Sequence, residues 1–185
     1  MLENILEFDQ NLLLYLNNLG NTNWDAFWFA VTNKLTFIPL YIFLLYLMTN
    51  GQNRKAVFLI FFILAIMITF TDQVTNLFKD GFERLRPCAD KNISHLLRIG
   101  DCRGFGFFSG HSSNSMSAAV FTILFLRSKY RKIIYLMIPW TLLVGYSRIY
   151  IGKHYPLDVL CGWLFGAFAG YIFFKLFKFL KRRFV

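Results

Sequence analysis

The stretch AVFLIFFILAIMITFTDQVTNL, residues 56–77, decides what kind of protein this chain can be. It contains a single charged side chain, Asp72, close to its end. As a helix, such a run is long enough to cross about 30 Å of hydrocarbon. Apolar runs at 27–48, 133–150 and 157–177 are similar, and 110–127 forms a fifth if its helix begins near Gly110. The sequence therefore predicts an all-α, polytopic membrane bundle with five transmembrane helices.

The composition agrees with this class. Of 185 residues, 56% are hydrophobic and only 16% are charged, so a soluble globule would expose too much apolar surface. We interpret residues 1–185 as one membrane domain. Residues 2–18 place leucine and isoleucine at helical spacing among acids and asparagines, and no signal peptide is visible. This pattern predicts an amphipathic helix at the membrane interface, and 80–108 is predicted to be a long outer loop.

The distribution of charge predicts the orientation in the membrane. The segments 54–55, 127–132 and 175–183 hold eleven basic residues and no acid, whereas all ten acids fall on the alternate side. By the positive-inside rule the basic segments and the C-terminus face the cytoplasm, and the N-terminus lies outside. The formal net charge of +10 is then an orientation signal. No nucleic-acid partner is predicted, because no soluble domain offers a basic face.

A first motif closes the span at 56–77: Lys79, six residues, then Arg86-Pro87. The last turns of this span carry polar residues at three- and four-residue steps, which places them on one side of the helix. These residues are Asp72, Thr75, Asn76 and Lys79. Inside a span such a stripe faces protein or water, because a lipid-exposed charge is costly. Taken alone, a lysine and an arginine at the end of a span are more often interfacial anchors than ligands.

A second motif, Ser109-Gly110-His111, opens the span at 110–127. Ser109 is a good N-cap, and Gly110 lets the chain bend before the helix. The unpaired N–H groups of that first turn can bind an anion, with His111 projecting from the same turn. The alternative is a tightly packed helix start with a hydrogen-bonded histidine.

A third motif joins the last two spans: Ser147-Arg148, then His154, then Asp158. The four-residue step lets Asp158 reach the imidazole of His154 and fix its tautomer. The same helix face continues as a stripe of small residues. These are Gly162, Gly166 and Gly170. The face is expected to pack against another helix, which turns the carboxylate into the bundle. The alternative is a structural ion pair between Asp158 and Arg148.

In this order and spacing the motifs resemble the type 2 phosphatidic acid phosphatase superfamily, over roughly residues 79–158. One departure is Phe108, where the family usually has proline before Ser109-Gly110-His111. The resemblance implies hydrolysis of a phosphate or diphosphate from a membrane lipid, with no metal and no cofactor, through a phosphohistidine. Undecaprenyl diphosphate, phosphatidylglycerophosphate, phosphatidate and lipid A are the candidate substrates. The charge distribution, which was read without the motifs, places all three of them on the outer face, so the site is expected on the periplasmic or extracellular side of a bacterial inner membrane.

The roles follow from the same resemblance. His154 is expected to attack phosphorus, and Asp158 to stabilise the charge that develops on its ring. His111 is expected to protonate the leaving oxygen. The phosphate is expected to be held by Lys79, Arg86, Arg148, Ser109 and Gly110. Two alternatives stay open: a lipid phosphotransferase on the same fold, and a non-catalytic scaffold that binds phospholipids in the membrane.

Cys88 and Cys102 both fall in the predicted outer loop, 14 positions apart, where an oxidising compartment permits a disulfide. Two unpaired thiols are the alternative, and no metal-ligand spacing is present nearby. Cys161 is interpreted as a small apolar filler and His95 as a solvated surface residue. Lys34, inside the first span, either reaches outward or lines a cavity.

Overall fold

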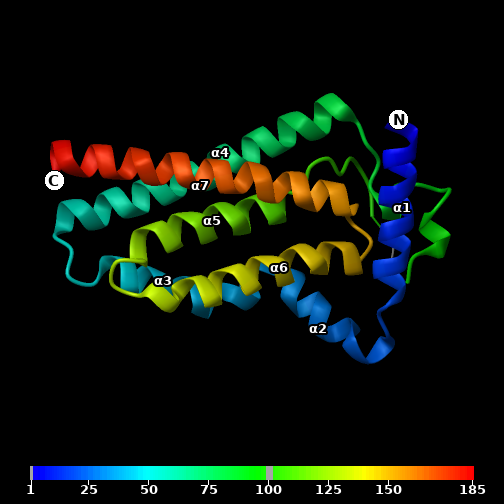
Figure 1. The fold of residues 1–185 in the computed structure, drawn as a ribbon, viewed down its shortest axis with the longest axis horizontal. Helices are drawn as coiled ribbons and strands as arrows, with labels where there is room; N and C mark the ends of the chain where they lie inside the picture. The colour runs from blue at the N-terminus through cyan, green and yellow to red at the C-terminus, as the bar shows by residue number, and fades with distance from the viewer. Residues whose placement is uncertain (1, 99–101) are drawn as a thin grey trace.

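Four long helices run along the length of the molecule in the computed structural model, which describes residues 2–98 and 102–185 (Figure 1). They are α4 (Arg54–Phe82), α5 (Gly110–Leu126), α6 (Ile134–Tyr150) and α7 (Pro156–Phe184). Helix α1 (Leu2–Asn18) lies across one end, where the chain between α4 and α5 also gathers, and the C-terminus lies at the other. Within the described ranges there is no strand, so the all-α prediction is confirmed.

The remaining elements are shorter. They are α2 (Thr22–Thr32), α3 (Ile38–Thr49) and the 3-10 turns η1 (Lys34–Phe37), η2 (Pro87–Ala89), η3 (Ser94–Leu96) and η4 (Arg131–Ile133). Residues 99–101 of the predicted outer loop lie outside the described residues.

Membrane-spanning helices are confirmed, whereas the count of five spans stays a prediction. Among the described residues, Arg54–Phe82, Arg131–Tyr150 and Pro156–Phe184 are long and apolar enough to cross a bilayer. A fourth span results if α2 and α3 count as one broken helix. Helix α5 has 17 residues and rises only about 26 Å. Large apolar side chains face outward along these helices, as lipid contact requires.

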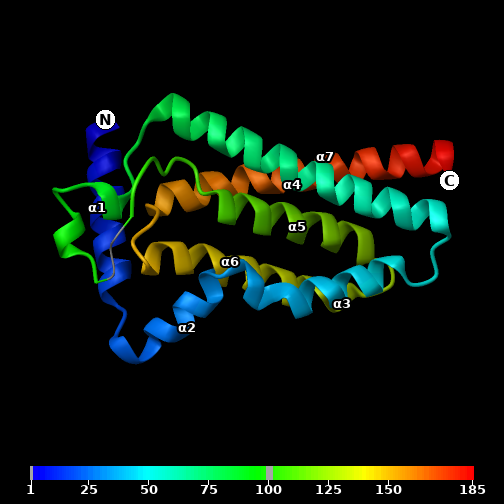
Figure 2. The ribbon, with the colours of Figure 1, turned by 180° about the vertical axis from the view of Figure 1, so that it is seen from behind.

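The helix predicted over 27–48 is broken, because α2 and the segment Lys34–Thr49 meet at an angle of 68°. Asn33 adopts an extended backbone, and its side chain accepts the N–H of Leu35 at 3.0 Å. It thereby ends α2 and caps η1, since an asparagine side chain competes with helical hydrogen bonds. The hydroxyl of Thr36 donates to the carbonyl of Ala30 at 2.6 Å across the break. Figure 2 shows α2 turning away from α3 at this point, where Lys34 lies.

Helices α5 and α7 approach each other closely along the glycine stripe. A Cβ atom at Gly162 would lie 2.6 Å from the carbonyl oxygen of Ser109, and one at Gly170 would lie 2.5 Å from that of Ser117. A Cβ at Gly166 would meet the carbonyl of Ser113. Only glycine permits this backbone approach. The prediction that this face packs against another helix is confirmed, and α5 is that helix.

Helix α1 is bound to the end of the bundle by one buried stripe, Asp9, Leu13 and Asn17. The amide of Asn17 donates to the carbonyls of Ile149 and Tyr150, at 3.1 and 2.6 Å, and so satisfies the end of α6. Apolar residues elsewhere on α1, such as Ile5 and Leu6, are exposed. An exposed apolar face is compatible with a helix at the membrane surface, which stays a prediction.

We expect Gly166→Ala to lower the free energy of unfolding in detergent by about 1–3 kcal/mol, because the added methyl group overpacks the α5–α7 contact. Gly81→Ala is the matched control. Nothing lies within 4 Å of a Cβ at that helical position, so we expect unchanged or slightly raised stability. Equal unfolding midpoints for the two variants would contradict the close packing.

Candidate active site

Residues of all three motifs line one cavity of about 790 Å³ between the helices. The motif residues in its wall are Lys79, Arg86, Gly110, His111, Arg148 and His154. They come from α4, the segment after it, the start of α5, the end of α6 and the turn before α7. The structure therefore brings together most of the residues that the sequence singled out.

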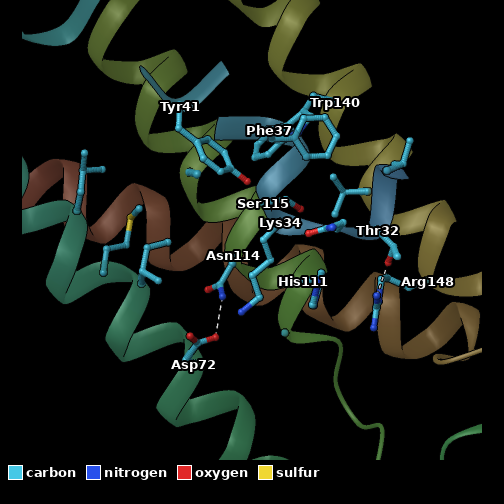
Figure 3. A pocket seen from close by; sticks show the side chains of 18 of the residues that line it. Thr32, Lys34, Phe37, Tyr41, Asp72, His111, Asn114, Ser115, Trp140 and Arg148 are labelled. Atoms are coloured by element: carbon cyan, nitrogen blue, oxygen red, sulfur yellow. Dashed lines mark hydrogen bonds between the residues drawn. The ribbon is translucent and has the colours of Figure 1, made fainter. Parts of the chain in front are cut away.

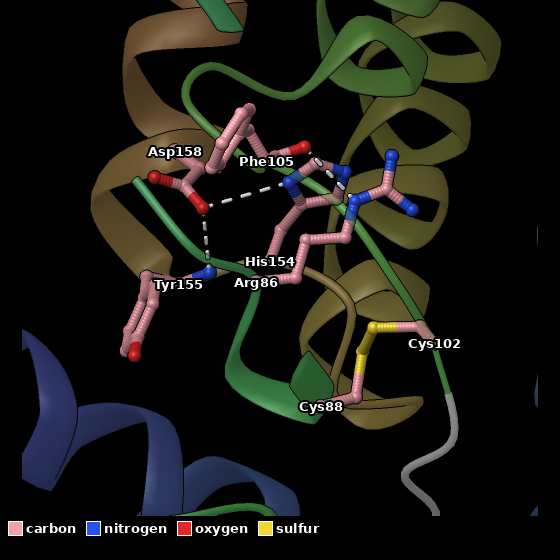
Figure 4. The surroundings of a disulfide bond; sticks show 7 residues. All are labelled: Arg86, Cys88, Cys102, Phe105, His154, Tyr155 and Asp158. Carbon is pink, nitrogen blue, oxygen red and sulfur yellow. Dashed lines mark hydrogen bonds and ion pairs between the residues drawn. A yellow bond between two sulfur atoms is a disulfide. The ribbon is translucent and has the colours of Figure 1, made fainter. Parts of the chain in front are cut away.

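His154 is buried, and its imidazole lies between the Asp158 carboxylate and the Arg86 side chain (Figure 4). Its Nδ1 lies 3.5 Å from Oδ2 of Asp158, and that oxygen also accepts the backbone N–H of Tyr155 at 3.0 Å. With Nδ1 on the carboxylate side, Nε2 is the nitrogen left for the cavity. Burial lowers the pKa of His154 to about 4, against the opposing effect of Asp158. The ring is therefore neutral at pH 7 and its lone pair can attack.

The three motif cations of the cavity, Lys79, Arg86 and Arg148, have no acidic partner within 4 Å among the residues that the structure describes. Arg86 donates from Nε to the carbonyl of Phe105 at 3.0 Å, and Lys79 donates to the side chain of Asn76 at 3.2 Å. Arg148 donates to the hydroxyl of Thr32 (Figure 3), while its buried Nε has no partner. Positive charge without a counter-ion, held in a partly buried cavity, is an anion site.

In the second motif, Gly110 and His111 line the cavity, whereas the hydroxyl of Ser109 does not. Ser109 is buried, and its Oγ accepts from the N–H and the hydroxyl of Ser112 at 3.4 and 3.0 Å. It caps α5 and is not among the residues lining the cavity, unlike Gly110 and His111. A Cβ at Gly110 would lie 3.8 Å from Nζ of Lys79, so the helix start lies close to that cation.

Phe108, which stands where the resemblance expects proline, holds the loop by packing. Its ring is buried, with its centroid 5.1 Å from that of Phe78 on α4 and 5.2 Å from that of Phe165 on α7. Aromatic pairs at such separations add stabilisation beyond their burial. The packing of the Phe108 side chain between α4 and α7 thus holds the loop in place, whereas a proline would restrict its backbone directly.

Asp158 pairs with Arg84 and not with Arg148, so the alternative of an Asp158–Arg148 ion pair is wrong. Nη1 of Arg84 donates to Oδ1 of Asp158 at 2.8 Å, and Nη2 donates to Oδ2 of Asp9 at 2.7 Å. Sequence reasoning missed Arg84 and Asp9. The available signal was the four-residue spacing of Asp9, Leu13 and Asn17, which puts two polar side chains on one face of the first helix.

A disulfide joins Cys88 and Cys102, whose Cα atoms are 5.4 Å apart. It lies beside the first motif, and the N–H of Cys88 donates to the carbonyl of Gly152 at 3.0 Å. The bridge therefore ties the segment that carries Arg86 to the turn that precedes His154. Cys161 is partly buried and free, and His95 is exposed. Lys34 lines the cavity, which is the second of the two alternatives given by the sequence, a side chain that reaches outward or one that lines a cavity.

Residues 57–182 match the model of the PAP2 superfamily. The chain belongs to the PAP2 superfamily. The prediction from the motifs is confirmed, and the protein is a membrane lipid phosphatase rather than the non-catalytic scaffold considered above.

Two bacterial relatives of this PAP2 protein are similar over nearly its whole length. A lipid A 4'-phosphatase of Bacteroides thetaiotaomicron is 35% identical over 179 residues, which cover 94% of this chain and 79% of the relative. A lipid A 4'-phosphatase of Porphyromonas gingivalis is 31% identical over 188 residues, covering 98% of this chain and 78% of the relative.

Two solved PAP2-type structures share the fold. The crystal structure of Aquifex aeolicus LpxE aligns with a TM-score of 0.65 and 25% identity, over 89% of this chain and 93% of that one. The PAP2-type phosphatidylglycerolphosphate phosphatase of Bacillus subtilis aligns with a TM-score of 0.73 over 98% of this chain and 88% of that one. At 21% identity the second likeness concerns the fold alone.

We expect His154 to stay neutral as the pH falls from 7 to 5 and to take up a proton near pH 4, because burial disfavours the charged ring. The measurement is nitrogen NMR of histidine-labelled protein, in which only three histidines contribute signals. His154→Asn identifies the relevant signal by its loss. Protonation near pH 6.5 would contradict the buried, neutral nucleophile.

Proposed function

We propose that this phosphatase removes a phosphate group from a lipid A-type glycolipid, without a metal ion, through a phosphohistidine at His154. The observation that carries the proposal is a cavity in which two histidines lie among cations that have no acidic partner within residues 2–98 and 102–185. A phosphate monoester supplies the missing negative charge. In phosphoryl transfer, such positioning and charge stabilisation provide most of the catalysis.

In the first step, Nε2 of His154 attacks phosphorus while Lys79, Arg86 and Arg148 hold the phosphate oxygens. The N–P bond forms as the bond from phosphorus to the lipid oxygen breaks. A bound phosphate brings negative charge beside His111 and so favours its protonated form. His111 then gives its proton to the lipid oxygen, which leaves as the lipid alcohol. His154 keeps its Nδ1 proton toward Asp158, whose carboxylate stabilises the positive charge on the ring.

In the second step, water attacks the phosphohistidine. His111, now neutral, accepts a proton from that water, and the N–P bond breaks. Inorganic phosphate leaves, and both histidines return to their starting protonation states. The same three cations stabilise the charge on the equatorial oxygens in both steps.

The shape of the cavity supports a lipid substrate. Beyond the charged residues, the wall continues into apolar side chains of α3, α4 and α6. These include Leu44, Met48, Leu64, Met67 and Trp140. An acyl chain can lie against this wall while its headgroup remains among the cations, since burial of each CH₂ contributes about 0.8 kcal/mol.

A polar part of the cavity wall supports a sugar headgroup in particular. It consists of Lys34, Asp72, Gln73, Asn76 and Asn114. The amide of Asn114 donates to Asp72 at 2.7 Å, and Lys34 reaches toward the same region (Figure 3). These side chains offer both donors and acceptors, which can bind the hydroxyl and amide groups of an acylated amino sugar. The two lipid A 4'-phosphatases among the relatives support the same substrate class.

The proposed site faces the outside of a bacterial inner membrane. The bent α2–α3 pair, α4, α5, α6 and α7 would make five crossings, with the C-terminus in the cytoplasm and α1 on the outer surface. The basic residues at the C-terminal end support this orientation through the positive-inside rule. The disulfide near the α1 end supports it independently, because such bridges persist in oxidising compartments.

We expect His154→Ala to reduce phosphate release to the background rate, because the proposed mechanism has no other group that forms the phosphoenzyme.

Arg148→Lys should lower kcat/KM about 100- to 1000-fold. Lysine keeps the positive charge, but it lacks the planar guanidinium that can bind the Thr32 hydroxyl and a phosphate at the same time. Lys178→Ala, an exposed residue outside this cavity, is the control and should stay within twofold of wild type.

The substrate is tested by phosphate release from a panel of lipids in detergent with excess chelator present. We expect lipid A to be the best substrate, ahead of phosphatidylglycerophosphate, phosphatidate and undecaprenyl diphosphate. Activity that disappears with chelator would contradict the metal-free mechanism, and equal rates on all four lipids would contradict the headgroup assignment. Phosphate recovered on a lipid acceptor, and not as free phosphate, would identify the phosphotransferase alternative.

A further inference from the structure

Arg84 connects two buried carboxylates behind the proposed nucleophile. Its two terminal nitrogens donate to Asp158 at 2.8 Å and to Asp9 at 2.7 Å. The two acids are 0% and 1% exposed, respectively, whereas the Arg84 side chain is 20% exposed. The guanidinium carbon also lies 3.9 Å from the centroid of the Tyr155 ring. The fork geometry of arginine suits such a bridge, because each carboxylate receives its own N–H group.

The bridge divides the two oxygens of Asp158 between two tasks. Oδ1 accepts from Arg84, so Oδ2 is left for the N–H of Tyr155 and for Nδ1 of His154. Without Arg84, Oδ1 would be a buried, charged oxygen with no hydrogen-bond partner, and the carboxylate could turn away from the histidine to find one. The position of Arg84 therefore determines which oxygen faces the imidazole.

Asp9 extends this network to α1. Its Oδ2 accepts from Arg84, and its Oδ1 accepts the N–H of Leu157 in the first turn of α7 at 2.8 Å. One carboxylate of α1 thus binds both the arginine that orients Asp158 and the helix turn that carries Asp158. Neither Asp9 nor Arg84 lines the cavity, so neither can touch a bound phosphate.

We propose that Arg84 and Asp9 are positioning residues for the phosphoryl transfer: through Asp158 they hold His154 in the orientation from which it attacks phosphorus. This inference rests on the proposed function and adds α1 to the machinery behind the nucleophile. A misplaced nucleophile loses rate steeply, about 100-fold for a shift of about 1 Å. Substrate binding is left intact, because Lys79, Arg86 and Arg148 are untouched.

The test compares kcat, KM and inhibition by vanadate, a phosphate mimic, for Arg84→Gln and Asp9→Asn. We expect kcat to fall about 10- to 100-fold, while KM and the vanadate inhibition constant stay within twofold. Arg84→Lys should be intermediate, because an ammonium group keeps the charge but cannot bridge both carboxylates in fork geometry. A merely structural role would not separate kcat from KM in this way.

Arg98 and Asp25 provide matched controls. Their ion pair is 2.6 Å long, Arg98 is also 20% exposed, and neither residue lines the cavity or contacts Asp158. Arg98→Gln and Asp25→Asn should therefore keep kcat within twofold. The proposal is overturned if the Arg84 and Asp9 variants also keep kcat within twofold, if their KM and vanadate constants rise in step with the loss, or if the control pair loses kcat equally.

A readout that does not need turnover separates this inference from the proposed function. Nitrogen NMR reports which ring nitrogen of His154 carries the proton, and wild type should show it on Nδ1, toward Asp158. Arg84→Gln and Asp9→Asn should weaken that preference, with Asp9→Asn carrying the test if Arg84→Gln does not fold. An unchanged tautomer in a folded variant overturns the positioning role, whereas wild type that hydrolyses no lipid phosphate overturns the function alone.

Discussion

The close backbone contact between α5 and α7 is the constraint on which the rest of the site depends. At its end nearest α1, the N–H of Ser109 donates to the carbonyl of Asp158 at 3.0 Å. This bond joins the first turns of two helices, one carrying His111 and the other following His154. Because the glycines of α7 admit no side chain there, the two turns are fixed relative to each other. The histidines line one cavity as a result of backbone packing.

The charges on the two sides of His154 are arranged differently. In front of His154, the cations Lys79, Arg86 and Arg148 have no acidic partner within 4 Å in the described part of the chain. Their mutual repulsion is relieved when a phosphate binds between them. Behind it, Asp9, Arg84 and Asp158 alternate in sign and satisfy one another. An unpaired buried charge costs several kcal/mol, which explains why a bridging arginine accompanies two buried acids. Binding and orientation are thus assigned to different residues.

Much of this arrangement could be predicted, and the remainder depends on contacts that local sequence does not encode. Long apolar runs predict membrane helices, and the cap at Ser109 and the stripe beginning at Asp158 predict helix starts and a packing face. The break at Asn33 was missed because its flanks are apolar enough to read as one span. Arg84 and Asp9 were missed because they are 75 positions apart, and no sequence pattern indicates that two residues so distant are in contact.

Helix α1 has a consequence for the order in which the protein is made. Its partners are synthesised late: Ile149 follows Asn17 by 132 positions, and Leu157 follows Asp9 by 148. Helix α1 therefore cannot complete these contacts until the end of α6 and the start of α7 have been made. Contacts of such sequence separation form slowly, since they close the largest loops of the chain. The orienting shell behind the nucleophile is complete only once the first turn of α7 has joined α1 and Arg84.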